Sequence, residues 1–141
     1  MYSKILVPVD LAEPQIARRI LKTALAMPLE DGGEVHVLTV VPTYGMAIVG
    51  SYFAKDFESK AMEATQAALT GFIAENAAAD HVRGHVAHGT IYDEIMRVAD
   101  HLDCDLIVMA AHRPELKDYL LGPNAARVVR HSKRSVMVVR E

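Results

Sequence analysis

The sequence has no tryptophan and a single cysteine, Cys104, among its 141 residues. One cysteine excludes an intramolecular disulfide and a zinc site built from cysteines, and its apolar neighbours indicate a core thiol in a reducing compartment. No stretch approaches the roughly 20 consecutive apolar residues of a membrane-spanning helix. The amino terminus does not resemble a signal peptide, so we expect a cytoplasmic protein without a membrane partner.

Positive charge is scarce as well, because 15 Lys and Arg stand against 18 Asp and Glu, for a net charge of -3. Proteins dedicated to nucleic acids are usually basic, so we expect no nucleic-acid partner. The cations near the carboxyl terminus have no aromatic residues between them, which favours a solvated helix end over a nucleic-acid surface. They are Arg127, Arg130, Lys133, Arg134 and Arg140.

Several catalytic and phosphate-binding motifs are also absent. Residues 9–13, after the first apolar run, contain neither a Walker glycine loop nor the G-x-G-x-x-G of dinucleotide-binding folds. No G-x-S-x-G elbow occurs, and no Ser or Cys is placed beside a His and an acid for acyl transfer. The sequence therefore argues against a hydrolase.

What is present is an alternation of apolar runs and helical patterns. Continuous β-branched runs predict buried strands, at residues 5–7, 35–41, 106–109 and 136–139, with a weaker one at 82–87. Helical spacing predicts helices after Pro14, over residues 56–78, from Thr90 and, briefly, after Gly122. This order predicts a single α/β domain, 1–141, with a doubly wound parallel sheet and helices on both faces.

The helical patterns also predict the buried side chains. In the first helix they are Ala17, Ile20, Leu21, Ala24 and Leu25. In the second they are Phe57, Ala61, Ala64, Ala68 and Phe72. In the third, which follows a capping box of Thr90 and Asp93, they are Ile91, Ile95, Val98, Ala99 and Leu102.

Ligands of doubly wound sheets bind outside the carboxyl ends of the strands, where the strand order reverses. The candidate residues are therefore those that follow the predicted strands: Pro8, Val9, Asp10, Thr39, Val40, Val41, Pro42, His88, Gly89, Ala110, Ala111, His112, Arg113 and Pro114. The Asp10 carboxylate would accept hydrogen bonds from a ribose hydroxyl or hold a metal. Alternatively, it closes a turn or caps the first helix.

A second candidate is the start of the last helix, formed by Gly122, Pro123, Asn124 and Ala125. Backbone N–H groups at a helix start bind anions, and Gly122 allows a phosphate to approach closely. Pro123 has no N–H, which leaves Asn124 and Ala125 as donors. Added charge would come from His112, Arg113, Arg127 or Arg130. The alternative is an ordinary surface loop capped by a proline.

Two further features leave alternatives open. Residues 42–55 form a long connection of apolar composition, which is either a lid or partner surface, or a loop folded over the core. His81, His85 and His88 lie close in sequence, but His85 and His88 point to opposite faces of a strand. We therefore interpret them as solvated edge histidines rather than metal ligands.

Residues 4–10, 36–40, 88–90, 105–109 and 120–140 together resemble the universal stress protein family, in the family's order and over essentially the whole chain. The stretch from Ala111 to Pro114, with residues 119–131 after it, is similar to the small enterobacterial-type members that carry Ser-His-Arg-Pro in this loop. The resemblance implies a five-stranded sheet of order 3-2-1-4-5. It also implies a homodimer that pairs strand 135–139 of two copies antiparallel.

The resemblance further implies binding of ATP, or of AMP or ADP, with or without Mg²⁺. Adenine would lie against Pro8, Asp10, Val40 and Met109, and the phosphates in a Gly-x-x-Gly, nine residues, Gly-Ser/Thr motif. The chain departs from that motif in three ways: Ala110 and Arg113 stand near the first two glycines, the loop is one residue shorter, and Pro123 replaces the Ser or Thr. Losing that hydroxyl and N–H costs about 1–3 kcal/mol of phosphate interaction, which Arg113 would offset.

The sequence thus favours an adenine-nucleotide-binding stress or regulatory protein. Nucleotide occupancy would order residues 111–121 and change a surface that an unidentified protein partner contacts. The alternative is a nucleotide-independent dimeric adaptor whose partner binds residues 42–55. A slow ATPase using Asp10 and Mg²⁺ stays open, but no general base is evident and no catalytic residue is assigned.

Overall fold

The computed structural model describes residues 1–42, 51–77, 80–111 and 122–140. Strands and helices alternate along the chain, as the sequence predicts. The elements are β1 (Tyr2–Pro8), α1 (Pro14–Leu25), β2 (Leu29–Val41), α2 (Ser51–Asn76), β3 (Val82–His88), α3 (Ile91–Leu102), β4 (Leu106–Ala110), α4 (Pro123–His131) and β5 (Ser135–Val139). None of the helices in these ranges is long and apolar enough to cross a membrane.

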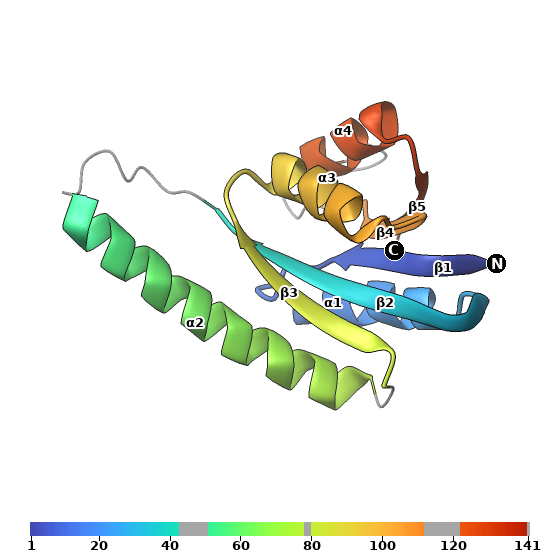
Figure 1. Ribbon diagram of the computed structural model, residues 1–141, viewed down its shortest axis with the longest axis horizontal. Helices are drawn as coiled ribbons and strands as arrows, with labels where there is room; N and C mark the ends of the chain where they lie inside the picture. Colours follow the sequence, from blue (N-terminus) through green and yellow to red (C-terminus); the bar gives the residue numbers. More distant parts are fainter. Residues whose placement is uncertain (43–50, 78–79, 112–121, 141) are drawn as a thin grey trace.

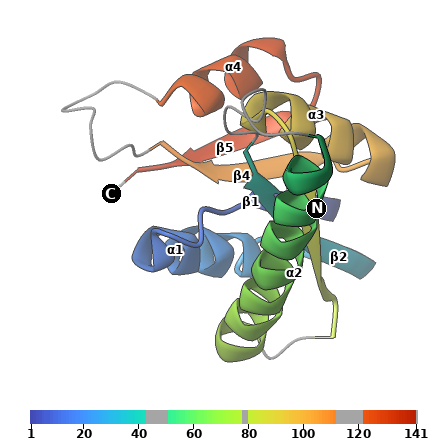
Figure 2. The ribbon, with the colours of Figure 1, turned by 90° about the vertical axis from the view of Figure 1, so that its left-hand side faces the viewer.

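The strands form one parallel sheet of order β3-β2-β1-β4-β5, which confirms the expected order. From β1 the chain winds outward through β2 to β3, and it then returns to the centre and winds the other way through β4 to β5. Helices α1 and α2 cover one face of the sheet, and α3 and α4 cover the other (Figure 1, Figure 2). The strand order therefore reverses between β1 and β4.

Alternate residues of the central strands supply two separate cores. Ile5 and Val7 pack against α1 and α2, whereas Leu6 between them packs against α3 and α4. The same alternation holds in β4, where Val108 faces the first core and Ile107 the second. Because both faces are covered, the strands read as continuous apolar runs rather than as alternating patterns.

The start of β4 is fixed to the start of β1 by the Asp105 carboxylate. It accepts hydrogen bonds from the backbone N–H groups of Ser3 at 2.9 Å and Lys4 at 3.0 Å, and from the Ser3 hydroxyl at 3.3 Å. Burial by itself raises the pKa of this carboxyl, but these donors outweigh burial and hold the pKa below its usual value. The two strands that flank the reversal are thereby aligned.

The predicted buried stripe of α2 is largely wrong. Phe57 is 60% exposed and Ala64 and Ala68 are exposed, whereas Leu69 is fully buried and packs with Phe72 in the first core. The spacing that starts at Phe57 describes a second apolar stripe of the same helix, which joins the core only at Phe72. Periodicity locates such stripes but does not say which of two a sheet will contact. The helix also begins at Ser51, before the predicted start.

The starts of β2 and α3 differ from the sequence predictions. β2 begins at Leu29, before the predicted start at residue 35, and runs on through Gly32, whose φ of 77° marks an irregularity. The pairing of β1 with β2 shifts register at this place, so the strand is distorted rather than ended. At the start of α3, Thr90 is the N-cap residue but its side chain makes no capping hydrogen bond, so no capping box forms.

Candidate functional site

A cleft of about 500 Å³ opens at the carboxyl ends of the strands, where the strand order reverses. Most of the described candidates that follow the strands or begin α4 line it, whereas Val41, His88, Gly89 and Pro123 do not. The candidates in the lining are Pro8, Val9, Asp10, Thr39, Val40, Pro42, Met109, Ala110, Ala111, Gly122, Asn124 and Ala125. The structure therefore brings the strand ends and the start of α4 together around a single cavity.

The β1–α1 turn forms one wall of the cleft and is rigid. Val9 donates its N–H to the Leu38 carbonyl at 2.8 Å, which extends the β1–β2 pairing to the rim. Asp10 Oδ1 accepts the Ala12 N–H at 2.9 Å, and the Asp10 carbonyl accepts the Glu13 N–H at 3.0 Å. Asp10 thus closes the turn, and it does not cap α1, since Glu13 is the N-cap residue.

This arrangement leaves Asp10 able to bind a ligand as well. Its side chain is exposed at the cleft, and its second carboxylate oxygen makes no hydrogen bond with the described residues. One carboxylate oxygen therefore holds the turn, while the other can accept a hydrogen bond from a hydroxyl group. The structural and ligand-binding interpretations of Asp10 are compatible.

The strands supply an apolar floor. Leu38 and Met109 are buried and Val40 is half-buried, and all three line the cleft. Thr39 is 7% exposed, and its hydroxyl donates to the Val9 carbonyl at 3.4 Å, so the protein itself engages this group. Apolar walls with a few polar groups at the edge are typical of sites for flat heterocyclic ligands.

The start of α4 forms the opposite, polar end of the cleft. The Gly122 N–H is engaged by the Ala111 carbonyl at 3.2 Å, and Pro123 has no N–H. The remaining donors of the first turn are Asn124 and Ala125, and no acidic residue stands in this turn to neutralise the helix dipole. Two backbone donors and the positive end of a helix can hold one anionic group.

Pro123 does not belong to the lining: it is exposed and lies outside the cleft. His112 and Arg113 fall outside the described residues, as do residues 43–50, which make up most of the 42–55 connection. The charges that the described lining does contribute are the carboxylates of Asp10 and Glu13. No group of three or more His, Cys, Asp or Glu in the described ranges is arranged for a metal ion.

Sequence reasoning missed part of the lining. Ala12, Glu13 and Ile16 come from the start of α1, and Ile91 comes from the start of α3. Helical periodicity assigned Ile91 wholly to the core, yet it is 36% exposed and borders the cavity. The sequence could have indicated these residues, because a helix that follows a strand begins at the edge of the sheet where that strand ends.

The sequence predicted that His81, His85 and His88 are solvated, but two of them contact other side chains. His88 Nδ1 lies 2.6 Å from Glu58 Oε1 of α2, and His85 Nε2 lies 2.7 Å from Nδ1 of His36 in β2. For His85 and His88 solvation was the wrong prediction, because β2 and α2 place partners there that are distant in sequence. His36 did not enter the sequence-based cluster at all.

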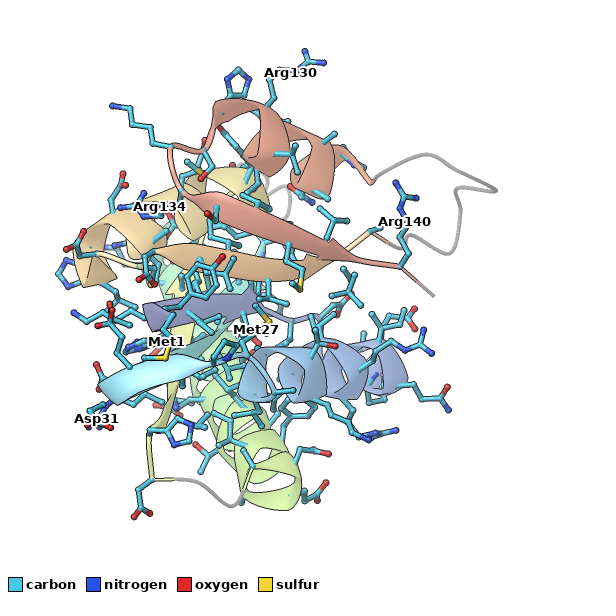
Figure 3. The ribbon with its side chains drawn as sticks, turned by 90° about the vertical axis from the view of Figure 1, so that its right-hand side faces the viewer. Met1, Met27, Asp31, Arg130, Arg134 and Arg140 are labelled. Carbon is cyan, nitrogen blue, oxygen red and sulfur yellow. The ribbon has the colours of Figure 1, made fainter. Side chains whose placement is uncertain are left out.

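The carboxyl-terminal cations are dispersed over several elements. Arg134 donates to the Cys104 carbonyl and, at 2.6 Å, to an Asp100 carboxylate oxygen, and Arg127 lies 4.0 Å from the centre of the Tyr92 ring. Figure 3 shows Arg130 and Arg140 extending outward from α4 and from the end of β5, away from the sheet. These cations lie apart from the cleft.

Comparison with known proteins gives consistent matches over the whole chain. The model of the universal stress protein family matches residues 1–140. Universal stress protein G of Salmonella typhimurium is 30% identical, with 99% of this chain and 100% of the relative covered. The solved structure of MJ0577 has a TM-score of 0.85 at 28% identity, covering 100% of this chain and 97% of that one. A universal stress protein solved in complex with cAMP has a TM-score of 0.60 at 21% identity, covering 98% and 97%.

Proposed function

Because the chain belongs to the universal stress protein family, we propose that it binds an adenine nucleotide in the cleft and acts as a homodimeric regulator in a stress response. The observation that carries this proposal is the convergence of an apolar floor, a free carboxylate oxygen and a helix start on one cavity of about 500 Å³. These three features match the three chemical parts of a nucleotide: base, sugar and phosphate.

Each part has a named position in this proposal. The adenine ring lies against Pro8, Val40 and Met109, which belong to the apolar part of the lining. The second oxygen of Asp10 accepts a hydrogen bond from a ribose hydroxyl. The Asn124 and Ala125 N–H groups bind phosphate. His112 and Arg113, which follow β4 in sequence, are proposed as further phosphate ligands.

The polar end of the cleft favours a ligand of low charge. It offers two backbone donors, whereas Gly122 and Pro123 offer none to a ligand, and Asp10 and Glu13 add negative charge nearby. AMP, ADP or a cyclic monophosphate suits these donors better than ATP alone, and Mg²⁺ would reduce the repulsion for ATP. A universal stress protein in complex with cAMP supports adenine-nucleotide binding by this fold.

The test starts with the purified protein as it is isolated. Acid denaturation releases any bound small molecule for mass spectrometry, and the stripped protein is then titrated by calorimetry with AMP, ADP, cAMP and ATP, with and without Mg²⁺. We expect one nucleotide per chain, with guanine nucleotides binding at least ten times more weakly. A protein that is isolated empty and gives no heat with any adenine nucleotide would overturn the proposal.

That negative result would favour the second candidate, a nucleotide-independent dimeric adaptor that binds a protein through residues 42–55. Both candidates share the homodimer, for which β5 is the proposed interface. β5 is an edge strand that pairs with β4 on one side, and its apolar residues Val136 to Val139 are half-buried in the single chain. An apolar edge strand can pair with a second copy of itself.

A further inference from the structure

Two histidines from neighbouring strands meet on the sheet face that carries α3 and α4, away from the nucleotide cleft. His36 of β2 is 3% exposed, and its Nδ1 lies 2.7 Å from Nε2 of His85 in β3. The rings are stacked, with centroids 5.0 Å apart and planes inclined by 30°. His85 is half-buried, and two imidazoles at this distance share a single hydrogen between their facing nitrogens.

The other ring nitrogen of His36 is also enclosed. Nε2 is buried and has no hydrogen-bond partner in the described chain, and the nearest carboxylate oxygen is Oε1 of Glu34 at 3.5 Å. Glu34 Oε2 in turn accepts a hydrogen bond from Arg83 Nε at 2.9 Å. Glu34, His36 and His85 therefore form a line of three groups that joins the middle of β2 to β3.

The number of protons bound by His36 and His85 determines whether their contact can form. The neutral pair carries two ring hydrogens, one of which lies between Nδ1 of His36 and Nε2 of His85. One added proton leaves that shared hydrogen in place, because the charged ring donates to the neutral one. A second added proton puts an N–H on both facing nitrogens, which cannot approach to 2.7 Å. The doubly protonated pair and the observed contact exclude each other.

The surroundings mostly oppose protonation. Burial is the main cause that lowers the pKa of both His36 and His85 below 6.5. Lys4 of β1 acts in the same direction on His36, Arg83 of β3 acts on both, and His101 of α3 acts on His85. Only Glu34 favours the charged form. These surroundings thus maintain the contact by disfavouring the second added proton.

The pH dependence of the β2–β3 pairing follows from these lowered pKa values. If β3 separates from β2, here called the opened form, the two rings regain ordinary pKa values near 6.5. The opened form therefore binds more protons than the closed, paired form at lower pH. The stability of the closed edge is complete above that value and falls as the pH decreases through and below it. Each unit by which closing lowers the pKa corresponds to a factor of about ten in the opening equilibrium.

The strand that carries His85 is β3. It lies at the edge of the sheet and is hydrogen-bonded only to β2 among the described strands. We propose that the His36–His85 pair is a pH-sensitive switch, which holds β3 on β2 near neutral pH and releases the edge of the sheet on acidification. Because α2 packs on β3 through Leu69 and Ile73, release also loosens α2. The switch does not depend on a bound nucleotide.

Hydrogen exchange of backbone amides, followed by NMR on the intact protein from pH 7.5 to 4.5, tests the proposal. Protection factors, which correct for the intrinsic rate, should fall at least tenfold for the donors between β2 and β3 and stay constant for those between β4 and β5. In His85→Gln the amide still bonds His36 but does not titrate, so protection should persist at pH 4.5. His101→Gln is the matched control and should retain the transition.

A second measurement uses only the wild-type protein, so its result does not depend on whether the variants fold. The ring ¹⁵N shifts of wild-type His36 and His85 should titrate in two coupled steps, both below pH 6.5. Constant protection between β2 and β3 would overturn the switch, and so would equal loss across the whole sheet. Independent titration of the two rings near 6.5 would overturn it too, as would an unchanged transition in His85→Gln.

Discussion

Gly122 donates its backbone N–H to the Ala111 carbonyl at 3.2 Å, which joins the end of β4 to the start of α4 beside the cleft. The bond removes the Gly122 N–H from any ligand. Since Pro123 has no N–H, the first donors that face the cavity belong to Asn124 and Ala125. The shortage of donors at this corner leads to the first prediction.

Pro123→Ser should strengthen the binding of phosphate-bearing nucleotides. The substitution adds a backbone N–H and a hydroxyl at the first position of α4, worth about 1–3 kcal/mol if both reach phosphate. We expect the Kd for ATP to fall about fivefold or more in calorimetry, while the Kd for adenosine stays unchanged. Equal gains for ATP and adenosine would mean that the effect does not come from a phosphate contact.

Val40→Trp should block the proposed adenine position. The indole would fill apolar space next to Met109 and Leu38, so adenine-nucleotide affinity should fall at least tenfold without unfolding. Val129→Trp, at a position of α4 that is 46% exposed and outside the cleft, is the matched control and should bind as the wild type does. Undiminished binding by a folded Val40→Trp variant would place the nucleotide elsewhere.

Two substitutions of Asp10 distinguish its structural role in the β1–α1 turn from its proposed role in binding the nucleotide. Asp10→Asn keeps an oxygen for the Ala12 N–H but removes the negative charge and one acceptor, so we expect an unchanged Tm and several-fold weaker nucleotide binding. Asp10→Ala also breaks the turn and should lose about 1 kcal/mol of stability in denaturant unfolding. If Asp10→Asn bound as tightly as the wild type, the residue would act through the turn alone.

Gly84→Ala should destabilise the packing of α2 on β3. A Cβ at this position would lie 2.9 Å from Ile73 Cδ1 and 3.1 Å from Leu69 Cδ2, so we expect a loss of about 1–3 kcal/mol in urea unfolding. Gly71→Ala is the control, because a Cβ there meets nothing within 4 Å on the exposed side of α2. That variant should gain roughly 0.5–1 kcal/mol from helix propensity. A neutral Gly84→Ala would show that α2 shifts freely on the sheet.

Val138→Lys should separate the proposed homodimer. A charge within β5 would be desolvated in a strand-to-strand interface, so the variant should be monomeric in light scattering at concentrations where the wild type is dimeric. Val129→Lys places the same charge on the outer side of α4 and should leave the dimer intact. A dimer that survives Val138→Lys would exclude β5 as the interface.

The local pattern of apolar and polar residues was sufficient to predict much of the fold. Runs such as 106–109 are apolar without interruption because each strand is covered on both faces, and that covering leaves a signal in the sequence itself. The grouping of residues around the cleft could be predicted in the same way. Residues that come directly after parallel strands lie at one edge of the sheet, so the sequence alone predicted that Asp10, Val40 and Ala110 lie close together.

Contacts between distant segments were decided only by the tertiary structure. His36 and His85 meet because β2 and β3 pair in one particular register, and Asp105 reaches Ser3 because β4 returns beside β1. The buried stripe of α2 was fixed by the shape of the sheet beneath it, where Gly84 makes room for Leu69 and Ile73. A single sequence records the chemical character of each residue, whereas register and helix rotation depend on surfaces that exist only after the chain has folded.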